Sequence, residues 1–435
     1  MSEGVRGRWL GVVLVVWGCS PDDPDEALAA ASSSTSTATD VDVYGADGHD
    51  GHTIDDLARG PFPDLPEVHE SCEERGARFG FVINPVNVVS FGSGTEIRDL
   101  GIAGGPAGMV VMYTQHGPSA EESGFKGIQI GTDGEANGSG WSVSGAGPAP
   151  AGFAREGGIL ITNCSEIPWW RAYNENGSAL GQTIFPAVAA CTGDVPAAAW
   201  TDAGYLVAWH ATPYEGCPDG CIMLAKGTPT TLFSTSVLYD AFIVTDPLSI
   251  AVASEAALVV ASHVNPAAQN ELAMTLIDHG GDLLFPPMVY PFDSAEPRGP
   301  QGQAPVAVGA TPDDGYVVLV GGRGGAYGRV ELDTVASVVT DFEETPLSSA
   351  FDGGDAFRSG MRVASRTGGF VLYGPATQRT GIEGTLLLML DRGGALESEL
   401  FLPGATTAAV VTREGRTFLV YADALLRSVE LGCVL

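Results

Sequence analysis

Residues 204–210, GYLVAWH, decide the fold, because this short apolar run introduced by a turn residue recurs along the chain. Such a run between turn signals is typical of a buried β-strand. It recurs as GMVVMYT (108–114), GILITNC (158–164), ALVVASH (257–263), GYVVLVG (315–321), GFVLYGP (369–375) and TFLVYAD (417–423). The successive copies start 50, 46, 53, 58, 54 and 48 residues apart. A repeat of about 50 residues made of short strands predicts the radial blades of a β-propeller.

The segments on either side of these strands also repeat. A strand of small residues precedes most copies: VPAAAWT (195–201), LSIAVAS (248–254), APVAVGA (304–310), GMRVAS (360–365) and TTAAVVT (406–412). Small side chains suit the crowded centre of a propeller. A further strand that ends in a turn follows most copies: GIQIGTDGE (127–135), RAYNENG (171–177), AMTLIDHGG (273–281) and LLLMLDRGG (386–394). Asp or Asn near Gly is hairpin chemistry, because glycine adopts positive φ easily, so we interpret these turns as hairpins rather than calcium loops.

The two ends of the repeat region complement each other. The last copy is followed by one more strand, RSVELGC (427–433), whereas RFGFVINPVNVVSF (78–91) precedes the first copy without a blade of its own. The sequence therefore predicts an all-β propeller of seven four-stranded blades, in which the N-terminal strand completes the C-terminal blade and removes an exposed edge. Six or eight blades are the alternatives, because the second blade has weak first and fourth strands and the stretch 286–303 is long.

The N-terminus carries an export signal. Residues 9–17 form an apolar run that is too short to span a bilayer, and Arg6 and Arg8 precede it, as in a signal peptide. Residues 16–19, VWGC, resemble the lipobox of bacterial lipoproteins, although Trp17 stands where that family has a small residue. The resemblance implies cleavage before Cys19 and acylation of its thiol. The alternative is ordinary cleavage after 29–31, AAA, which would leave four acidic residues between the apolar run and the cut.

These features divide the chain into a signal peptide (1–18), a tether (19–71) and a propeller (72–435). Between residues 20 and 71 there are thirteen acidic residues against Arg59 alone, so the tether should stay solvated and extended. We interpret its ADGHDGH tract (46–52) as linker rather than as a metal site. The whole resembles a bacterial lipoprotein with a kelch-length propeller, which implies attachment to the cell envelope, most simply the outer membrane, facing the periplasm or the surface.

The net charge of −32 bears on the partners. Nucleic acid and anionic lipid headgroups need a basic surface, so neither is expected to bind. Contact with the membrane is expected only through the N-terminal lipid.

The cysteine count fits an exported chain. If Cys19 carries lipid, six cysteines remain, an even number that predicts three disulfides in an oxidising compartment. Ring closure brings Cys72 to Cys433, neighbouring blades bring Cys164 to Cys191, and a small loop joins Cys217 to Cys221. Other pairings stay open, as does the alternative of reduced thiols in the core.

A ligand is expected where the loops between second and third strands gather on one face. The candidates on these loops are His116, Trp169, Trp170, His210, Tyr214, Asp219, His263, Arg323 and Arg379. His210 and His263 occupy the same offset in adjacent blades, so two imidazoles on one rim could bind a metal ion or serve as acid and base. No carboxylate recurs beside them in the sequence, and no HExxH, GxSxG or P-loop pattern occurs. We therefore predict no catalytic residue, metal or cofactor. Strand alternation predicts that one of Trp169 and Trp170 points inward and the other outward.

The predicted function is a lipid-anchored binding module that presents its loop face to an envelope protein, a peptide or a glycan. One alternative is a hydrolase or lyase that acts on an extracellular polymer through the rim histidines. The other is a structural component of an envelope complex.

Overall fold

The computed structural model describes most of the predicted propeller and begins at Cys72. The described residues are 72, 78–82, 84–91, 94–105, 108–118, 123–131, 133–138, 140–143, 151–155, 158–164, 168–174, 178–186, 191, 196–201, 203–213, 217–218, 220–228, 231–240, 248–264, 270–292, 304–321, 325–351, 355–357, 360–366, 368–413 and 415–434. The predicted signal peptide, the lipidation site Cys19 and the tether lie outside these residues.

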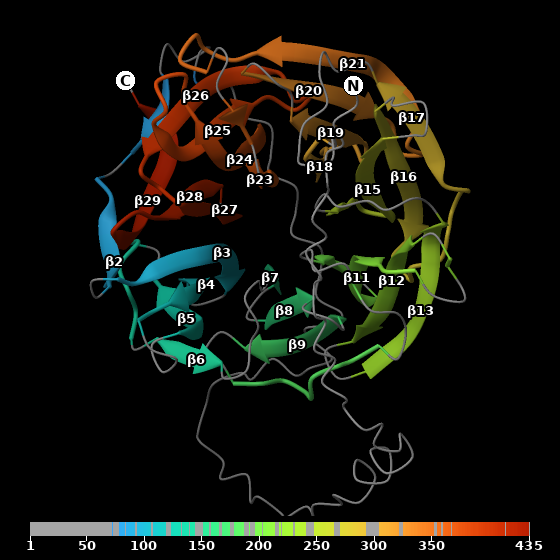
Figure 1. The fold of residues 1–435 in the computed structure, drawn as a ribbon, viewed down its shortest axis with the longest axis horizontal. Helices are drawn as coiled ribbons and strands as arrows, with labels where there is room; N and C mark the ends of the chain where they lie inside the picture. The colour runs from blue at the N-terminus through green and yellow to red at the C-terminus, as the bar shows by residue number, and fades with distance from the viewer. Residues whose placement is uncertain are drawn as a thin grey trace, which may run out of the picture. The chain divides into compact units, whose positions relative to one another are not determined.

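The described residues form an all-β propeller and contain no helix (Figure 1). Six sheets are blades of at least four strands, and one further sheet, β7 to β9, has three described strands. All strand pairs are antiparallel, and each sheet runs outward from a first strand beside the central axis. Each first strand contacts the first strand of the next sheet, from β3 around to β27 and back to β3, so the ring is closed.

The strands repeat in the same order along the chain. The first strands are β3 (Glu96–Gly105), β7 (Ala151–Arg155), β10 (Ala197–Thr201), β14 (Ser249–Val252), β18 (Val306–Ala310), β23 (Arg362–Arg366) and β27 (Thr407–Arg413). The second strands are β4 (Gly108–His116), β8 (Gly158–Cys164), β11 (Gly204–Ala211), β15 (Ala256–Val264), β19 (Tyr316–Gly321), β24 (Gly369–Thr377) and β28 (Arg416–Ala422). The second strands are the predicted apolar repeats, and the small-residue strands ahead of them are the innermost ones.

The third and fourth strands complete the blades. The third strands are β5 (Gly124–Ile130), β9 (Pro168–Asn174), β12 (Cys221–Thr228), β16 (Asn270–Asp278), β20 (Ala326–Leu332), β25 (Glu383–Leu390) and β29 (Leu425–Val434). The outer strands are β6 (Trp141–Val143), β13 (Thr231–Asp240), β17 (Met288–Phe292), β21 (Val338–Pro346) and β26 (Leu396–Pro403), with β1 (Arg78–Phe81) and β2 (Val86–Ser90) in the last blade. A two-residue strand, β22 (Asp355–Ala356), also pairs with β24.

The apolar runs are buried on both faces because each blade lies between two others. In β15, Leu258 and Val260 pack in one core cluster with Val306 and Val318 of the next blade. Val259 packs in another cluster, against the preceding blade. A strand covered on both sides has no polar face, which explains why the repeats are continuous apolar runs rather than alternating ones.

The β7–β9 sheet lacks a regular outer strand in the described residues. Backbone hydrogen bonds nevertheless hold the segment 178–186 along the outer edge of β9. Trp170 N donates to Ile184 O (3.1 Å), Ile184 N donates to Trp170 O (2.8 Å) and Leu180 N donates to Ala172 O (2.9 Å). These bonds stand in an irregular register, which agrees with the weak fourth strand expected here.

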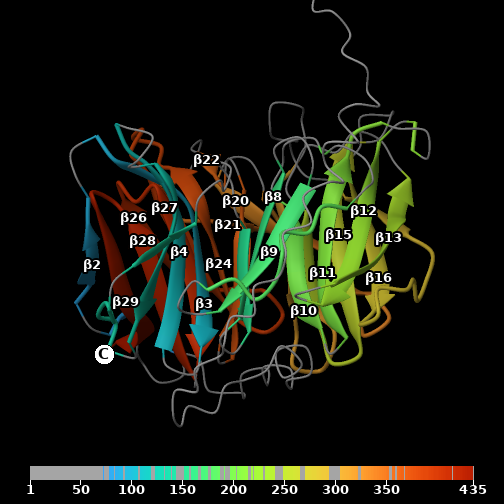
Figure 2. The same cartoon turned by 90° about the horizontal axis from the view of Figure 1, so that it is seen from below.

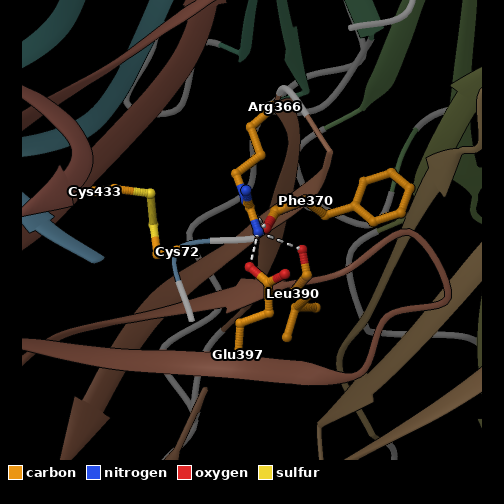
Figure 3. Close-up of a disulfide and its surroundings, with 6 residues drawn as sticks. All are labelled: Cys72, Arg366, Phe370, Leu390, Glu397 and Cys433. Carbon is orange, nitrogen blue, oxygen red and sulfur yellow. Dashed lines mark hydrogen bonds and ion pairs between the residues drawn. A yellow bond between two sulfur atoms is a disulfide. The ribbon is translucent and has the colours of Figure 1, made fainter. Parts of the chain in front are cut away.

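The N-terminal strands complete the last blade, which confirms the predicted ring closure. Both β1 and β2 pair with β29, with Phe79 opposite Cys433 and Val86 opposite Ser428. Cys72 and Cys433 form the predicted disulfide, with 5.2 Å between their Cα atoms. Figure 3 shows this disulfide beside the buried ion pair of Arg366 and Glu397, which belongs to the adjacent blade.

The other cysteines behave differently. Cys191 is disulfide-bonded. The side chain of Cys164 lies outside the described part, so its pairing with Cys191 stays a prediction. The predicted Cys217–Cys221 bond is not formed in the structure. Cys217 lies in a tight turn in which Gly220 N donates to its carbonyl (3.2 Å), whereas Cys221 opens β12. Both thiols are buried in one core cluster, where they pack as small apolar groups.

Among the described residues, no helix is long and apolar enough to cross a membrane.

Candidate functional site

The strands run between two faces of the ring that differ in their connections (Figure 2). On the loop face, second strands lead to third strands, and on the turn face, third strands lead to fourth strands. The loop-face connections vary in length: 117–123, 165–167, 212–220, 265–269, 322–325, 378–382 and 423–424. Varied connections on a regular scaffold are the usual place for binding residues.

The turn face is built from one repeated hairpin. In four sheets the side-chain Oδ1 of the first turn residue accepts a hydrogen bond from the backbone N–H four residues later. The pairs are Asn174 and Ser178 (2.7 Å), Asp278 and Asp282 (2.8 Å), Asp333 and Ser337 (2.8 Å), and Asp391 and Ala395 (2.7 Å). These bonds confirm the hairpin interpretation of the Asp and Asn turns and show how their side chains are used.

The same turns join neighbouring blades. Thr201 Oγ1 donates to the carbonyl of His279 (2.9 Å), which lies in the turn of the next blade. The same kind of contact joins β20 to the turn after β25. Tyr327 and Arg329 donate to the carbonyls of Gly394 and Gly393, each at 2.8 Å. The turn face thus serves the packing of the ring.

Two sequence-predicted candidates meet on the loop face, between β4 and β9. We name this place the His116 seam and define it by Thr114, His116 and Trp169. Thr114 and His116 lie on the face of β4 that carries Met112, and Trp169 is partly buried against the cluster that contains Met112 and Tyr173. Thr114 Oγ1 and His116 Nε2 are buried and have no hydrogen-bond partner among the described residues. The seam thus combines an indole with two buried polar atoms to which no described residue is hydrogen-bonded.

Trp170 was predicted to lie on the ligand face, and this prediction is wrong because the side chain is inside the core. Its side chain is fully buried, and its Nε1 donates to the hydroxyl of Tyr205 (2.6 Å). Alternation along β9 turns Trp170 toward β11, where it also contacts Trp209 with 6.1 Å between ring centroids. Of the two tryptophans, Trp169 is therefore the one available to a ligand.

A second group of polar residues lies where the β10–β13 and β14–β17 blades meet at the loop face. We name it the His210 seam and define it by His210, Tyr239 and Glu271. His210 and Tyr239 both stand opposite Ile222 in the β11–β12–β13 ladder, so they share the face that packs against β15. Glu271 stands opposite His263 in the β15–β16 ladder. The side chain of His263 lies outside the described part.

Tyr239 and Glu271 of the His210 seam interact electrostatically. Burial raises the pKa of Tyr239, and the negative charge of Glu271 raises it further. The Tyr239 hydroxyl is therefore a hydrogen-bond donor at neutral pH, and Glu271 supplies an acceptor beside it. His210 is 5% exposed, so it lies at the base of the seam rather than on the open rim that the sequence predicted.

Among the remaining candidates, Arg379 is described and does not join either seam. Arg379 is exposed in the turn between β24 and β25, where its backbone N–H donates to the carbonyl of Ala350 (2.9 Å). Tyr214, Asp219 and Arg323 lie outside the described residues. Within the described part, no group of three or more His, Cys, Asp or Glu is placed to hold a metal ion.

Sequence analysis missed Thr114, Tyr239 and Glu271. Nothing in the local sequence marks them, because each sits in an ordinary strand, and their proximity to the histidines arises from the packing of blades. Glu271 can be placed opposite His263 only when the register between β15 and β16 is known.

Comparisons with known proteins concern the fold alone. No protein-family model matches the sequence, and no curated protein matches it. A solved structure of a protein of unknown function from Dyadobacter fermentans is similar at 12% identity and a TM-score of 0.43, covering 82% of this chain and 99% of that one. A subtype N11 neuraminidase-like protein of A/flat-faced bat/Peru is similar at 10% identity and a TM-score of 0.46, covering 74% and 94%. A GH43_1 enzyme from Xanthomonas citri matches at 12% identity and a TM-score of 0.32, covering 55% and 86%. Likenesses this distant carry no argument about activity or substrate.

Proposed function

We propose that this chain is an exported, lipid-anchored binding module that takes its ligand on the loop face of a seven-bladed propeller. The β7–β9 sheet, with the segment 178–186 along its edge, counts as the seventh blade. The envelope is the compartment that the lipobox resemblance implies. The disulfides of Cys72 and Cys191 fit that compartment, because disulfides persist where the environment is oxidising.

The His116 seam carries the proposal. Buried polar atoms in native proteins nearly always have a hydrogen-bond partner, and leaving one without a partner costs about 1–3 kcal/mol. Thr114 Oγ1 and His116 Nε2 have none among the described residues. Both atoms lie at the loop-face end of β4, next to a tryptophan that is partly exposed. A ligand with hydrogen-bonding groups around an apolar surface would contact the indole, and it would satisfy both buried atoms once side chains at the seam move aside to admit it.

The chemistry of the seam favours a glycan or a peptide. An indole stacks on the apolar face of a sugar ring or packs against a peptide side chain, while imidazole and hydroxyl groups bind the polar edge. The small number of basic residues makes a polyanionic ligand unfavourable in a chain with a net charge of −32.

Binding tests use the full chain with Cys19→Ser, so that no acyl chain is attached, against immobilised cell-wall glycan fragments and a peptide array. We expect Trp169→Ala and His116→Ala each to weaken binding of a retained probe by about tenfold, which corresponds to about 1.4 kcal/mol. Val339→Ala is the matched control, because Val339 is 66% exposed on β21, in another blade. If every retained probe bound the three variants equally well, the ligand would not lie in the seam.

The anchor is tested separately, by intact mass of the protein from a bacterial membrane fraction. A mass that starts at Cys19 and includes acyl chains supports the proposed processing. A mass that retains residues 1–18 would overturn it, and the loop-face proposal would then stand without the envelope.

The His210 seam supports a second candidate function, that of an enzyme acting on an extracellular polymer. The structure supplies what the sequence lacked, a carboxylate, Glu271, opposite His263 and close to Tyr239. An imidazole and a carboxylate on the facing sides of two packed blades are groups that general acid–base catalysis uses. Turnover of a polymer that is lost in His210→Ala and in Glu271→Gln but kept in Trp169→Ala would favour this function. Equal turnover in all three variants would remove it.

A further inference from the structure

Exposed apolar side chains gather on the outer wall of two neighbouring blades. Phe233 in β13 is 56% exposed, and four more lie in or just before β17: Leu283 (49%), Leu284 (44%), Phe285 (43%) and Val289 (45%). We name these five residues the wall patch. Contiguous exposed apolar groups on a soluble protein are unusual and mark interaction surfaces.

The two halves of the wall patch are joined by one ion pair. Lys226 in β12 stands opposite Ser234 of β13, next to Phe233. Its Nζ binds Asp282 Oδ1 at 2.8 Å, and Asp282 directly precedes Leu283. Phe233 and Leu283 therefore each adjoin a residue at the same contact between blades.

The wall patch is uncharged in a strongly acidic chain. Residues 231–239 and 283–292 contain no Asp, Glu, Lys or Arg, although the chain has 53 acidic residues. The outer strands β21 and β26 carry Glu343, Glu344 and Glu399, among other acids. Two copies of a chain with a net charge of −32 repel each other over most of their surface, so an uncharged wall is where a second copy can approach.

The outer edge of β13 adds a second feature of the same wall. Among the described strands, only β12 pairs with β13, so no described strand occupies the other edge of β13. β13 has ten residues, no proline and a single charged residue, Asp240 at its end, whereas β17 has five residues and contains Pro291. Charge, proline, short length and β-bulges are the usual protections of an edge strand; β13 has two bulges but carries no charge and no proline in its middle. Residues 234–237 lie in regular register between two bulges and offer Ser and Thr hydroxyls for cross-strand bonds.

We propose that two copies of this chain associate through the wall patch, with their β13 edges antiparallel about a twofold axis. An antiparallel pair of identical strands is self-complementary, so the contact closes at a dimer and does not propagate. The two wall patches bury each other beside the paired edges. The dimer leaves both loop faces accessible, because the wall patch lies on the outer side of the ring.

The test is the molecular mass of the full chain with Cys19→Ser, measured by sedimentation equilibrium over a concentration series. We expect twice the chain mass of 44.9 kDa at high concentration and dissociation on dilution. Phe233→Ser with Phe285→Ser removes two large apolar groups, and Ser236→Lys places a charge on the edge. Each should weaken the dimer by at least about tenfold.

Val339→Ser is the matched control, because Val339 is 66% exposed on β21 but lies outside the wall patch. It should leave the dimer unchanged, and all variants should keep the wild-type circular dichroism spectrum. A wild-type protein that stays monomeric at every concentration would overturn the proposal, and binding of that monomer to lipid vesicles would identify a membrane as the occupant. A dimer that the wall variants do not weaken, or that Val339→Ser weakens equally, would also overturn it.

Discussion

Cys72 and Cys433 are 361 residues apart in the sequence and are joined by a disulfide at the point where the ring closes. The bond links the N-terminal segment directly to β29, the strand with which β1 and β2 pair. In the chain-entropy picture, a disulfide that closes so long a loop contributes on the order of 5 kcal/mol as an upper limit. We therefore expect Cys72→Ser with Cys433→Ser to lower the free energy of unfolding by several kcal/mol, measured by urea denaturation without reductant.

The disulfide of Cys191 stays intact in that double variant and serves as the internal control, checked by mass with and without reduction. The prediction fails if the double variant unfolds at the wild-type urea concentration. That result would mean that pairing of β1 and β2 with β29 is sufficient to hold the ring closed.

Arg366 and Glu397 form a buried ion pair beside this closure (Figure 3). Arg366 also donates to the carbonyls of Leu390 (3.0 Å) and Phe370 (3.3 Å). Removing only the carboxylate leaves a buried guanidinium without its counter-charge, and such losses cost about 3–5 kcal/mol. We expect Glu397→Leu to lower the free energy of unfolding by about 3 kcal/mol, measured by urea denaturation.

Arg366→Met combined with Glu397→Leu provides the comparison. Apolar replacement of both partners is often close to neutral, so the double variant should be more stable than Glu397→Leu alone. A double variant less stable than the single one would show instead that the two carbonyl contacts of Arg366 outweigh the burial of its charge.

The features that follow from local sequence could be predicted. The second strands and their spacing follow from apolar runs between turn residues, and the ring closure follows from one missing strand at the C-terminus and one extra strand at the N-terminus. Because closure fixes the neighbours of the last blade, the Cys72–Cys433 bond could be predicted as well.

The candidate site depends on relationships that the sequence does not record. Tyr239 and Glu271 come together because two blades pack face to face. Strand alternation says which side of a sheet a residue takes only after one residue of that strand has been placed. For the same reason, strand alternation predicted that one of Trp169 and Trp170 points inward but could not tell which one. The Cys217–Cys221 bond was predicted from a spacing that allows it, whereas the turn at Gly220 and the core around the two thiols decide against it in this structure.

Gly281 allows the packing between blades to be tested at a turn. It has a φ of +78°, and a Cβ there would lie 3.1 Å from Lys226 Cδ and 3.2 Å from Leu206 Cδ2, both in the neighbouring blade. Gly404 has a similar φ of +75° but nothing within 4 Å of an added Cβ. Both Gly→Ala variants strain the backbone, by about 1 kcal/mol, but only Gly281→Ala also requires side chains of the neighbouring blade to move by a few tenths of an ångström.

We expect Gly281→Ala to lower the free energy of unfolding by about 1–3 kcal/mol more than Gly404→Ala, because overpacking a tight contact adds to the backbone cost. Thermal and urea denaturation of the two variants measure the difference. Equal losses would show that the Lys226 side chain moves aside freely and that the turn does not hold the two blades together.

Tyr113 allows a test of burial through pH. Desolvation raises the pKa of its hydroxyl from 10.0 to about 12 in the folded protein. Above pH 10 the unfolded chain loses this proton while the folded chain keeps it, so rising pH favours unfolding until the folded pKa is reached. The stabilisation is fully present below pH 10 and is lost between about pH 10 and 12. Tyr113→Phe removes the titrating group. Between pH 9 and about pH 11, the free energy of unfolding should therefore fall by about 1 kcal/mol more in the wild type than in this variant. Urea denaturation across this range measures both curves, and curves that stay parallel would mean that Tyr113 ionises in the folded protein as readily as in the unfolded chain.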